Sequence, residues 1–357
     1  MIRVGILFGG RSGEHEVSLL SAASVIRALG KEKYEAVPVG ITKEGRWLLY
    51  DGPVDAIENG SWQTAAEKAL AEEPYRFRLE LLGDGPGSLR DRIDFALPIL
   101  HGPYGEDGTI QGLFEMLDLP YGGCGVAGSA LAMVKIQAKR IFAQAGLPQG
   151  AFLPVMLEEA EADPAGVLDR VEAARSYPVF VKPANLGSSV GISKAKDRAQ
   201  LQTAVELAGR YDRRILVEEG IDCRELEAGI LGNQAPEAST VGEIIPSNEF
   251  YDYTAKYLSG TSRICIPADI PPETAEEVRR LSVEAYRLLD GSGFARVDFF
   301  LERATGRVLL NEVNTIPGFT RFSMFPLLWG EAGLAYPDLL ERIITLGYER
   351  YYAKNRR

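Results

Sequence analysis

The first forty residues limit the possible folds more than any other segment of the chain. Residues 1–8 are an apolar run typical of a short buried strand, residues 9–13 form a glycine-rich loop, and residues 17–29 carry apolar side chains at helical spacing. Two further apolar runs, at 36–41 and 95–100, are separated by helical or loop segments. This order predicts an N-terminal α/β domain with a parallel sheet, in which functional loops follow the strand ends.

The remaining sequence predicts two further units of mixed helix and strand. At 357 residues, the chain is longer than one hydrophobic core usually fills. The expected elements are a helix over 129–144, strands at 178–182, 191–193, 215–219 and 225–231 around one helix near 199–208, a helix over 272–289, and strands at 294–301 and 308–313. We predict domains at 1–134, 135–224 and 225–357, the second a small antiparallel α+β domain. Residues 51–92 lack clear periodicity and are assigned only to the first domain.

Composition and charge argue against several classes of function. The chain is 46% hydrophobic and 25% charged, as ordinary globular proteins are, and its formal charge of −11 comes without a basic run. Nucleic acid and anionic membranes are therefore not expected as partners. Cys124, Cys223 and Cys265 are far apart and form no CxxC pair. With no apolar run of membrane-spanning length and no charged leader, we expect a cytoplasmic protein.

Two late strands carry the strongest chemical signal. Because side chains alternate across a strand, one face is expected to present Arg296, Asp298 and Phe300, and the partner strand is expected to present Leu310, Glu312 and Asn314. Paired as a hairpin around Thr305-Gly306, the strands would gather three oxygen ligands of the kind that magnesium prefers. Magnesium is commonly held by a few carboxylates together with nucleotide phosphates, so the pattern favours ATP chemistry over plain solvated strand positions.

A phosphate-binding loop is also expected, although GxxxxGK[ST] is absent from the sequence. Lys182 ends an apolar strand and is followed by the small-residue turn 183–191, whose backbone N–H groups could approach phosphate closely. The alternative is a plain hairpin turn. A second lysine could come from Lys135 or from Lys139, one helical turn later, and periodicity does not decide between them or against a solvated helix face.

Two other signals are weaker. Residues 123–128 match GxGxxG before a helix, but no Asp or Glu occurs between 129 and 157, so the ribose-binding acid of a dinucleotide-dependent dehydrogenase is missing. Glu14 stands at the start of the first helix, where a carboxylate is electrostatically favoured. It could be a simple cap-region charge or a receptor for the ammonium group of a small substrate.

Taken together, the motifs resemble the D-alanine:D-alanine ligase family of the ATP-grasp superfamily. The resemblance covers almost the whole chain, and its motifs are GGRSGEHEVSL at 9–19, HGPYGEDGTIQG at 101–112, VKPANLGSSVGISK at 181–194, FYDYTAKY at 250–257, RVDFFL at 296–301 and LNEVNTIPGFT at 310–320. It implies a multidomain fold of α/β and α+β type, in which an N-terminal parallel-sheet α/β domain precedes an ATP-grasp pair of α+β domains.

The resemblance also implies the ligands of the nucleotide site. Two magnesium ions, with manganese as an alternative metal, would be held by Asp298, Glu312 and Asn314. Lys135, rather than Lys139, occupies the family position that contacts nucleotide phosphates together with Lys182, although Val134 stands where the family often has Asp. The adenine-binding linker would include Glu218, Glu219 and Ile221, and Glu225 would bind the ribose hydroxyls.

For the reaction, the resemblance implies that one D-alanine is phosphorylated by ATP on its carboxylate and that the amine of a second D-alanine displaces phosphate. Arg296 and the backbone N–H of Gly318 match the groups that stabilise the tetrahedral oxyanion. The remaining implied roles are Glu14, Ser188 and Tyr257 for the first ammonium group, His101 near the first substrate, Ser323 for the second carboxylate, and Lys256 with Tyr257 on a lid at 247–263.

The identity of the second substrate is a narrower expectation. Related ligases that make D-alanyl-D-lactate depart from the lid that carries the tyrosine, so Tyr257 argues for D-alanine. The alternatives are a D-alanine:D-lactate or D-alanine:D-serine ligase, another ATP-grasp enzyme, or an inactive nucleotide-binding regulator. The expected partners are D-alanine and ATP, the expected assembly is a homodimer, and the product would supply peptidoglycan precursor synthesis.

Overall fold

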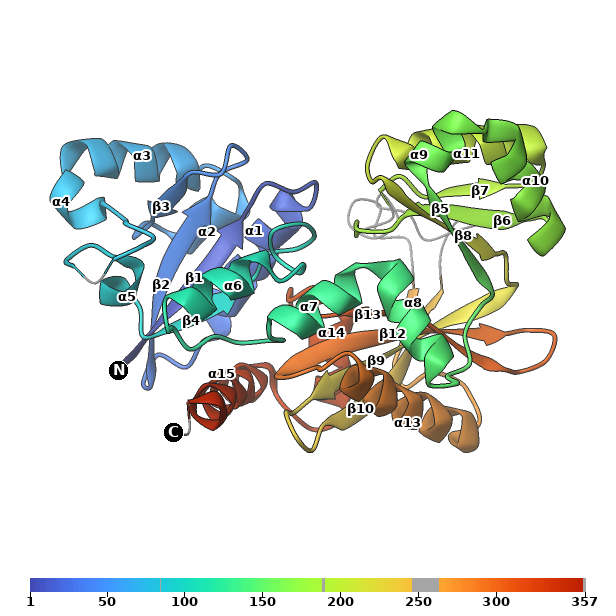
Figure 1. The fold of residues 1–357 in the computed structure, drawn as a ribbon. Coiled ribbons are helices and arrows are strands. Elements are labelled where there is room, and N and C mark those ends of the chain that lie inside the picture. The colour runs from blue at the N-terminus through green and yellow to red at the C-terminus, as the bar shows by residue number, and fades with distance from the viewer. Residues whose placement is uncertain (84, 188–189, 246–262, 356–357) are drawn as a thin grey trace.

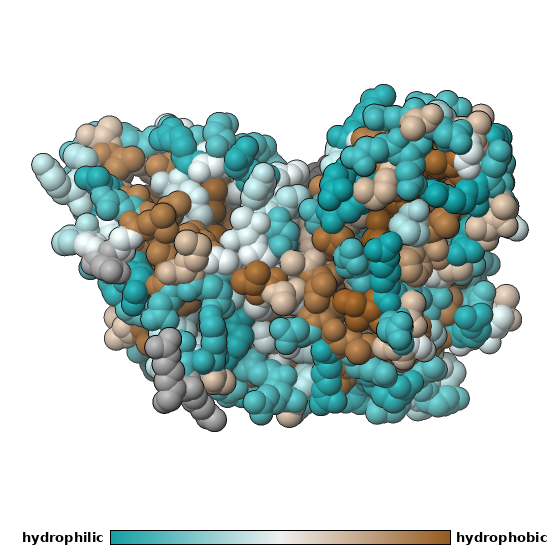
Figure 2. All heavy atoms as spheres, viewed as in Figure 1, coloured by the Kyte–Doolittle hydropathy of each residue, from teal (hydrophilic) through white to brown (hydrophobic). Residues whose placement is uncertain are grey.

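A computed structural model describes residues 1–83, 85–187, 190–245 and 263–355. The chain forms three lobes, each built on its own β-sheet (Figure 1). The space-filling view shows a notch between the N-terminal and central lobes at the top of the molecule (Figure 2). Within the described part of the chain, no helix is both long and apolar enough to cross a membrane.

The N-terminal lobe contains the parallel sheet that the sequence predicts. Its strand order is β3-β2-β1-β4, with β1 at Ile2–Gly9, β2 at Tyr34–Ile41, β3 at Trp47–Leu49 and β4 at Phe95–Pro98. β1 pairs in parallel with both β2 and β4, which confirms the prediction, whereas β3 is an antiparallel edge strand that was not predicted. Helix α1 at His15–Ala28 follows the glycine-rich loop and begins two residues earlier than expected.

Residues 51–92, which sequence periodicity leaves unassigned, contain four short helices. They are α2 at Val54–Glu58, α3 at Trp62–Glu72, α4 at Pro74–Phe77 and α5 at Leu89–Arg92. The Trp62 side chain is 1% exposed and meets Phe8 of β1 edge to face, with 5.0 Å between ring centroids. It also lies so close to Gly40 that a Cβ atom there would be 2.1 Å from the indole ring. This segment therefore covers the N-terminal sheet.

The central lobe is an antiparallel sheet with three helices. Its strand order is β5-β8-β6-β7, with β5 at Phe152–Met156, β6 at Val179–Pro183, β7 at Ser193–Ala195 and β8 at Arg214–Glu219. The helices are α9 at Leu157–Ala162, α10 at Pro164–Ala174 and α11 at Arg198–Gly209. The antiparallel α+β prediction is confirmed, but it missed β5, α9 and α10. It also wrongly grouped the strand at 225–231 with this unit, because that strand pairs within the C-terminal sheet.

The C-terminal lobe is a five-stranded sheet covered by a long helix. The strand order is β11-β10-β9-β12-β13, with β9 at Cys223–Leu231, β10 at Glu237–Ile245, β11 at Arg263–Cys265, β12 at Phe294–Glu302 and β13 at Val308–Asn314. Helix α13 at Pro272–Leu288 packs on this sheet through Val278, Leu281 and Ala285. Helix α6 at Thr109–Met116 belongs to the N-terminal lobe, where Ile110 and Phe114 are buried.

The prediction of a single helix over 129–144 is wrong. Two helices occupy this region, α7 at Val126–Met133 and α8 at Lys135–Gln144. Val134 between them has a non-helical ψ of 86°, and the N–H of Lys135 donates to the carbonyl of Ala184 at 3.0 Å. The Lys135 N–H thus donates to a distant residue and not to the carbonyl of the preceding helical turn. Lys135 consequently begins a new helix.

The buried clusters join segments that are far apart in the sequence. Ala132, Ala138 and Phe142 of α7 and α8 pack in the core of the C-terminal sheet. After α14 at Met324–Glu331, helix α15 at Tyr336–Lys354 returns to the N-terminal lobe, where Leu340 and Ile343 share a core with β1. The contiguous domains at 1–134, 135–224 and 225–357 remain a proposal. These two buried clusters cross the boundaries of these domains, because each contains residues from more than one of them.

Candidate active site

The hairpin of β12 and β13 has the register on which the predicted metal site depends. Asp298 is the cross-strand partner of Glu312, and Arg296 is the partner of Asn314. Directly opposed residues on neighbouring strands bring their Cβ atoms within about 5.5 Å of each other. The prediction that Asp298, Glu312 and Asn314 gather on paired strands is therefore confirmed.

One detail of that prediction is wrong, because Leu310 does not share a face with Glu312. The register shifts between Asp298 and Phe299, so Phe299 pairs with Leu310 and Asn311 is the extra residue of a β-bulge. Leu310 consequently joins the core of the C-terminal lobe together with Phe299. The bulge turns Asn311 and Glu312 toward the same cavity, and the buried Oδ1 of Asn311 has no hydrogen-bond partner among the described residues.

Cationic and amide groups surround the paired carboxylates. Arg296 binds both carboxylate oxygens of Asp298 at 2.7 Å, and its Nε also lies 2.9 Å from Glu227. The side-chain amide of Asn314 donates to Asp298 at 2.9 Å, and the Lys135 ammonium lies 3.3 Å from Glu312.

This donor set fits a hard divalent cation. Asp298 and Glu312 are half-buried carboxylates held opposite each other, with the orphaned carbonyl oxygen of Asn311 close in sequence to Glu312. No cluster of three or more His, Cys, Asp and Glu side chains occurs within the described ranges. Any magnesium bound here would therefore need ligands from the amides or from a substrate, which is how magnesium is usually held in nucleotide sites.

Two cavities, of about 800 Å³ and about 540 Å³, adjoin the partly exposed face of this hairpin, where Arg296 lines the first and Phe300 lines the second. The smaller one opens between the central and C-terminal sheets and is called here the nucleotide cavity. Its walls include every predicted ATP-binding residue, namely Lys135, Lys182, Glu218, Glu219, Ile221 and Glu225, and also the predicted metal ligand Glu312. The structure thus brings together side chains from α8, β6, β8, β9 and β13 around one space.

The floor of the nucleotide cavity is a buried group of two lysines and one carboxylate. The Lys182 ammonium lies 2.6 Å from one oxygen of Glu218, and the Lys139 ammonium lies 2.7 Å from the other. Burial raises the pKa of Glu218, but the two lysines outweigh it and bring the pKa to about 2. Burial likewise lowers the pKa of Lys182, but Glu218 and Glu312 more than offset this effect, so its pKa is raised. Glu218 and Lys182 are therefore both charged at neutral pH.

Lys135 and Lys139 consequently differ although they share a helix face. The Lys135 ammonium donates to the carbonyl of Leu186 at 2.8 Å and lies beside Glu312, at the edge of the turn that follows β6. The Lys139 side chain is 3% exposed and points to Glu218. The geometry supports Lys135 as the lysine nearest the metal ligands, and it gives Lys139 a separate place that periodicity does not predict.

The loops that follow β1 and β4 meet the glycine-rich turn of the central lobe. Glu14 is buried, and a Cβ atom on Gly187 would lie 2.7 Å from its carboxylate. A Cβ atom on Gly102 would lie 2.8 Å from the same carboxylate. Glycine at both positions therefore allows two backbone segments from different lobes to close around Glu14.

His101 and Glu106 hold the loop that precedes Gly318. The Nδ1 atom of His101 lies 3.0 Å from the carbonyl oxygen of Ile316, and the N–H of Ile316 donates to Glu106 at 3.2 Å. Because a carbonyl oxygen can only accept, Nδ1 carries the proton, and Nε2 faces the hydroxyl of Ser21 at 3.3 Å. That hydroxyl also accepts from the N–H of Phe319 at 3.4 Å. Three side chains of the N-terminal lobe thus fix the loop.

Burial controls the charge of both His101 and Glu106. It lowers the pKa of His101, although Glu14 acts in the opposite direction, so the imidazole is neutral near pH 7. Burial also raises the pKa of Glu106, and the neighbouring carboxylate of Glu14 raises it further, to about 8. Near neutral pH, Glu14 therefore has a carboxyl neighbour that is largely protonated.

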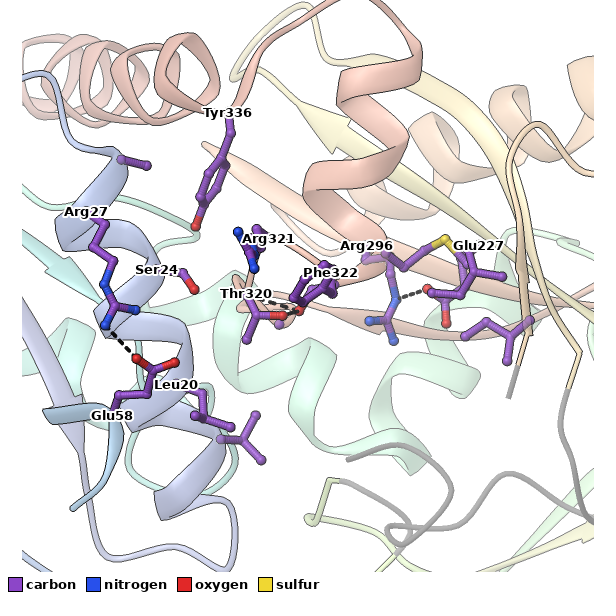
Figure 3. Close-up of a pocket in the computed structure, with 17 residues that line it drawn as sticks. Leu20, Ser24, Arg27, Glu58, Glu227, Arg296, Thr320, Arg321, Phe322 and Tyr336 are labelled. Atoms are coloured by element: carbon purple, nitrogen blue, oxygen red, sulfur yellow. Dashed lines mark hydrogen bonds and ion pairs between the residues drawn. The ribbon is translucent and has the colours of Figure 1, made fainter. Parts of the chain in front are cut away.

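The larger cavity lies between α1 and the loop before α14, and it is called here the acceptor cavity (Figure 3). Arg296, Gly318 and Ser323 all line it, which brings together the predicted oxyanion groups and the predicted carboxylate receptor. The Ser323 hydroxyl lies 2.8 Å from that of Thr320 and stands at the N-terminal end of α14. Figure 3 shows Arg296 with its partner Glu227 on one side and Ser24 and Arg27 of α1 on the other.

Three predicted site residues, Ser188, Lys256 and Tyr257, lie outside the described residues, as does nearly all of the predicted lid at 247–263. Three site residues, Glu106, Glu227 and Asn311, were not predicted from the sequence, and Lys139 was considered only as an alternative to Lys135. Glu106 lies inside the motif at 101–112, and Asn311 lies inside the motif at 310–320, so their place in a motif was the available signal. Glu227 and Lys139 become visible only once the fold brings them to their partners.

Comparisons with known proteins agree on one family. The chain matches the family models described as the D-ala D-ala ligase N-terminus, over residues 3–124, and the D-ala D-ala ligase C-terminus, over residues 141–345. It is 50% identical to the D-alanine–D-alanine ligase of Acetivibrio thermocellus, covering 98% of this chain and 96% of that protein. It is 52% identical to the corresponding protein of Thermoanaerobacter pseudethanolicus, covering 99% and 98%.

Solved structures show the same relationship. The VanG D-Ala:D-Ser ligase from Enterococcus faecalis superposes with a TM-score of 0.83 at 35% identity, covering 97% of this chain and 99% of that one. The D-alanine-D-alanine ligase from Coxiella burnetii superposes with a TM-score of 0.83 at 34% identity, covering 99% and 95%.

Proposed function

This chain belongs to the D-ala D-ala ligase family, and from that premise we propose that it uses ATP to join two D-alanine molecules into D-alanyl-D-alanine. The observation that carries the proposal is that one face of the β12–β13 hairpin lines two neighbouring cavities. Glu312 lines the nucleotide cavity, and Arg296 lines the acceptor cavity. A phosphoryl group transferred in the first of these cavities can therefore activate an acyl group that is attacked from the second.

The first step places a carboxylate beside the terminal phosphate of ATP. An oxygen of the first D-alanine attacks the γ-phosphorus, the bond from that phosphorus to the β,γ-bridging oxygen breaks, and ADP leaves. Lys135 and Lys182 line the nucleotide cavity, and in the proposal they bind the phosphates and counter the charge of the transferred group. Glu14, which lies close to Gly102 and Gly187, is assigned in this proposal to the substrate ammonium group.

Asp298, Glu312 and Asn314 are the residues that would hold magnesium. Their cross-strand positions, and the present pairing of both carboxylates with cationic side chains, support that assignment. When bound, the ion supplies positive charge to the phosphate oxygens during phosphoryl transfer. Arg296, which binds Asp298, also lines the acceptor cavity.

The second step forms the peptide bond. The neutral amine of the second D-alanine attacks the acyl carbon and forms a tetrahedral oxyanion. As the oxyanion collapses, the carbon–oxygen bond to phosphate breaks, the nitrogen loses one proton and the amide forms. The Arg296 guanidinium and the Gly318 N–H are the donors aimed at that oxyanion. Ser323, at the start of α14, is proposed to bind the carboxylate of the second D-alanine, because a helix N-terminus favours an anion.

The proposal is tested by supplying purified protein with ATP, magnesium and D-alanine, and by measuring ADP while the product is identified by mass. Parallel reactions with D-serine or D-lactate beside D-alanine test the second substrate, because one structural relative is a D-Ala:D-Ser ligase. We expect the D-alanine dipeptide to predominate at neutral pH. A predominant mixed product would move the assignment to another member of the family, and no D-alanine-dependent ADP would reject it. A homodimer, a cytoplasmic location and a role in peptidoglycan precursor synthesis complete the proposal.

A further inference from the structure

We propose that Lys139 is a positioning residue that holds the Glu218 carboxylate as a fixed anionic acceptor, so that the nucleotide cavity selects adenine over a 6-oxo purine. The inference rests on the proposed ATP site and deepens it. It concerns a buried lysine to which neither the sequence motifs nor the proposed reaction assigns a role.

The first step of the argument is the shared use of Glu218. Its two oxygens are divided between Lys139 at 2.7 Å and Lys182 at 2.6 Å. The two lysines are not equivalent, because the Lys182 side chain is 12% exposed toward the cavity while that of Lys139 is only 3% exposed. Both lysines line the cavity, and in the proposal the less buried Lys182 turns toward a bound phosphate while Lys139 keeps its contact with Glu218.

The second step is the consequence of that movement. A buried carboxylate without a cationic partner takes up a proton rather than remain charged. If Lys182 turns to the phosphates, Lys139 is the cation that keeps Glu218 ionised. Two contacts fix the position of Lys139. The side-chain amide of Gln149 donates to the backbone carbonyl of Lys139 at 2.8 Å, and the Lys139 ammonium lies 5.9 Å from the centre of the Phe152 ring.

The third step links the charge of Glu218 to the choice between adenine and hypoxanthine. Glu218 lies at the end of β8, immediately before residues 219–221, which join the central and C-terminal lobes and line the same cavity. An ionised carboxylate can only accept hydrogen bonds, so it pairs with the exocyclic amino group of adenine and repels the carbonyl oxygen of hypoxanthine. A protonated Glu218 could donate to that carbonyl, and the discrimination would fall.

The experiment compares ATP with ITP in the wild type and in Lys139→Met. The two purines differ in the group on C6 and in the proton that hypoxanthine carries on N1, and the N1 difference is the same for both proteins. For the wild type we expect kcat/KM for ATP to exceed that for ITP by on the order of tenfold or more, with a ratio that is constant from pH 6 to 9. For Lys139→Met we expect the ratio to fall several-fold and to become dependent on pH, recovering as Glu218 ionises at high pH.

Three further variants make the result specific. Lys139→Arg keeps the charge and should restore most of the discrimination. Glu218→Gln cannot ionise, so combining it with Lys139→Met should abolish the pH dependence of the ratio. Arg140→Met removes a charge from an exposed neighbouring position on α8 and should leave the ratio unchanged. Should Lys139→Met fold poorly, Lys139→Gln removes the charge while it keeps a hydrogen-bond donor.

A ratio in Lys139→Met that equals the wild-type ratio at every pH would overturn the inference and leave the proposed ligase activity intact. An equal loss of activity with ATP and ITP, at all pH values, would show that Lys139 has only a structural role and would also overturn it. Failure of the wild type to use ATP at all would instead reject the proposed function.

Discussion

At the residue scale, Arg296 connects the two halves of the proposed reaction. It binds Asp298 through two hydrogen bonds and lines the acceptor cavity. Replacing it with alanine removes one donor to the oxyanion, and losing one such donor typically lowers turnover on the order of 10²-fold or more. We therefore expect Arg296→Ala to be nearly inactive while its ATP affinity, measured by calorimetry, stays close to that of the wild type. Turnover within a few-fold of the wild type would reject the role.

Glu106 provides a second test at this scale, because its pKa of about 8 lies above its unfolded value of 4.5. Since the folded protein holds the proton more tightly, Glu106 contributes most to stability below pH 4.5 and this contribution is lost as the pH rises to 8. Difference infrared spectra between the wild type and Glu106→Gln should show a protonated-carboxyl band at pH 6 that disappears by pH 9. A band that is absent at pH 6 would contradict the assignment.

Some site residues could be predicted from sequence, and the reason differs for each. The oxygen ligands Asp298 and Glu312 were predictable because strand alternation and a turn between the strands fix their faces. Lys139 was not, because helical periodicity shows only that it shares a face with Lys135, while its role depends on Glu218 of a distant strand. Asn311 was not, because no residue type marks the bulge that turns it into the nucleotide cavity.

At the element scale, local helix signals give way to tertiary contacts at two places. The residues on both sides of Val134 form helices readily, yet the helix is interrupted there. The N–H of Lys135 donates to the carbonyl of Ala184, which follows β6, instead of continuing the preceding helix. Residues 51–92 have weak periodicity because their helices are short and a single large side chain, Trp62, anchors much of the segment. Neither contact can be read from local sequence.

The anchor formed by Trp62 leads to a prediction about stability. A Cβ atom at Gly40 would lie 2.1 Å from the indole ring, so Gly40→Ala forces a shift in a packed core. Overpacking of this kind typically costs about 1–3 kcal/mol of unfolding free energy. The matched control is Gly112→Ala within α6, where the added atom meets nothing within 4 Å and alanine favours the helix. Urea unfolding should show a loss only for Gly40→Ala, and equal midpoints for the two variants would contradict the packing.

At the scale of the whole molecule, the site exists only where the three lobes meet. The N-terminal lobe supplies Glu14, His101 and Glu106, the central lobe supplies Lys182 and Glu218, and the C-terminal lobe supplies the acidic hairpin. Helix α15, near the end of the chain, packs in the core of the N-terminal lobe. Helix α8 packs in the core of the C-terminal lobe and also lines the nucleotide cavity. Sequence motifs identified nearly all of these groups, but only the folded chain separates the nucleotide cavity from the acceptor cavity.

The most direct test of the central claim follows oxygen from substrate to product. The protein is given ATP, magnesium and D-alanine labelled with ¹⁸O in both carboxylate oxygens, and the released phosphate is examined by mass spectrometry. Phosphoryl transfer to the carboxylate, followed by attack of the amine on the acyl carbon, predicts one ¹⁸O atom in each phosphate, formed in step with the dipeptide. Dipeptide formed together with unlabelled phosphate would contradict the proposed course of the reaction.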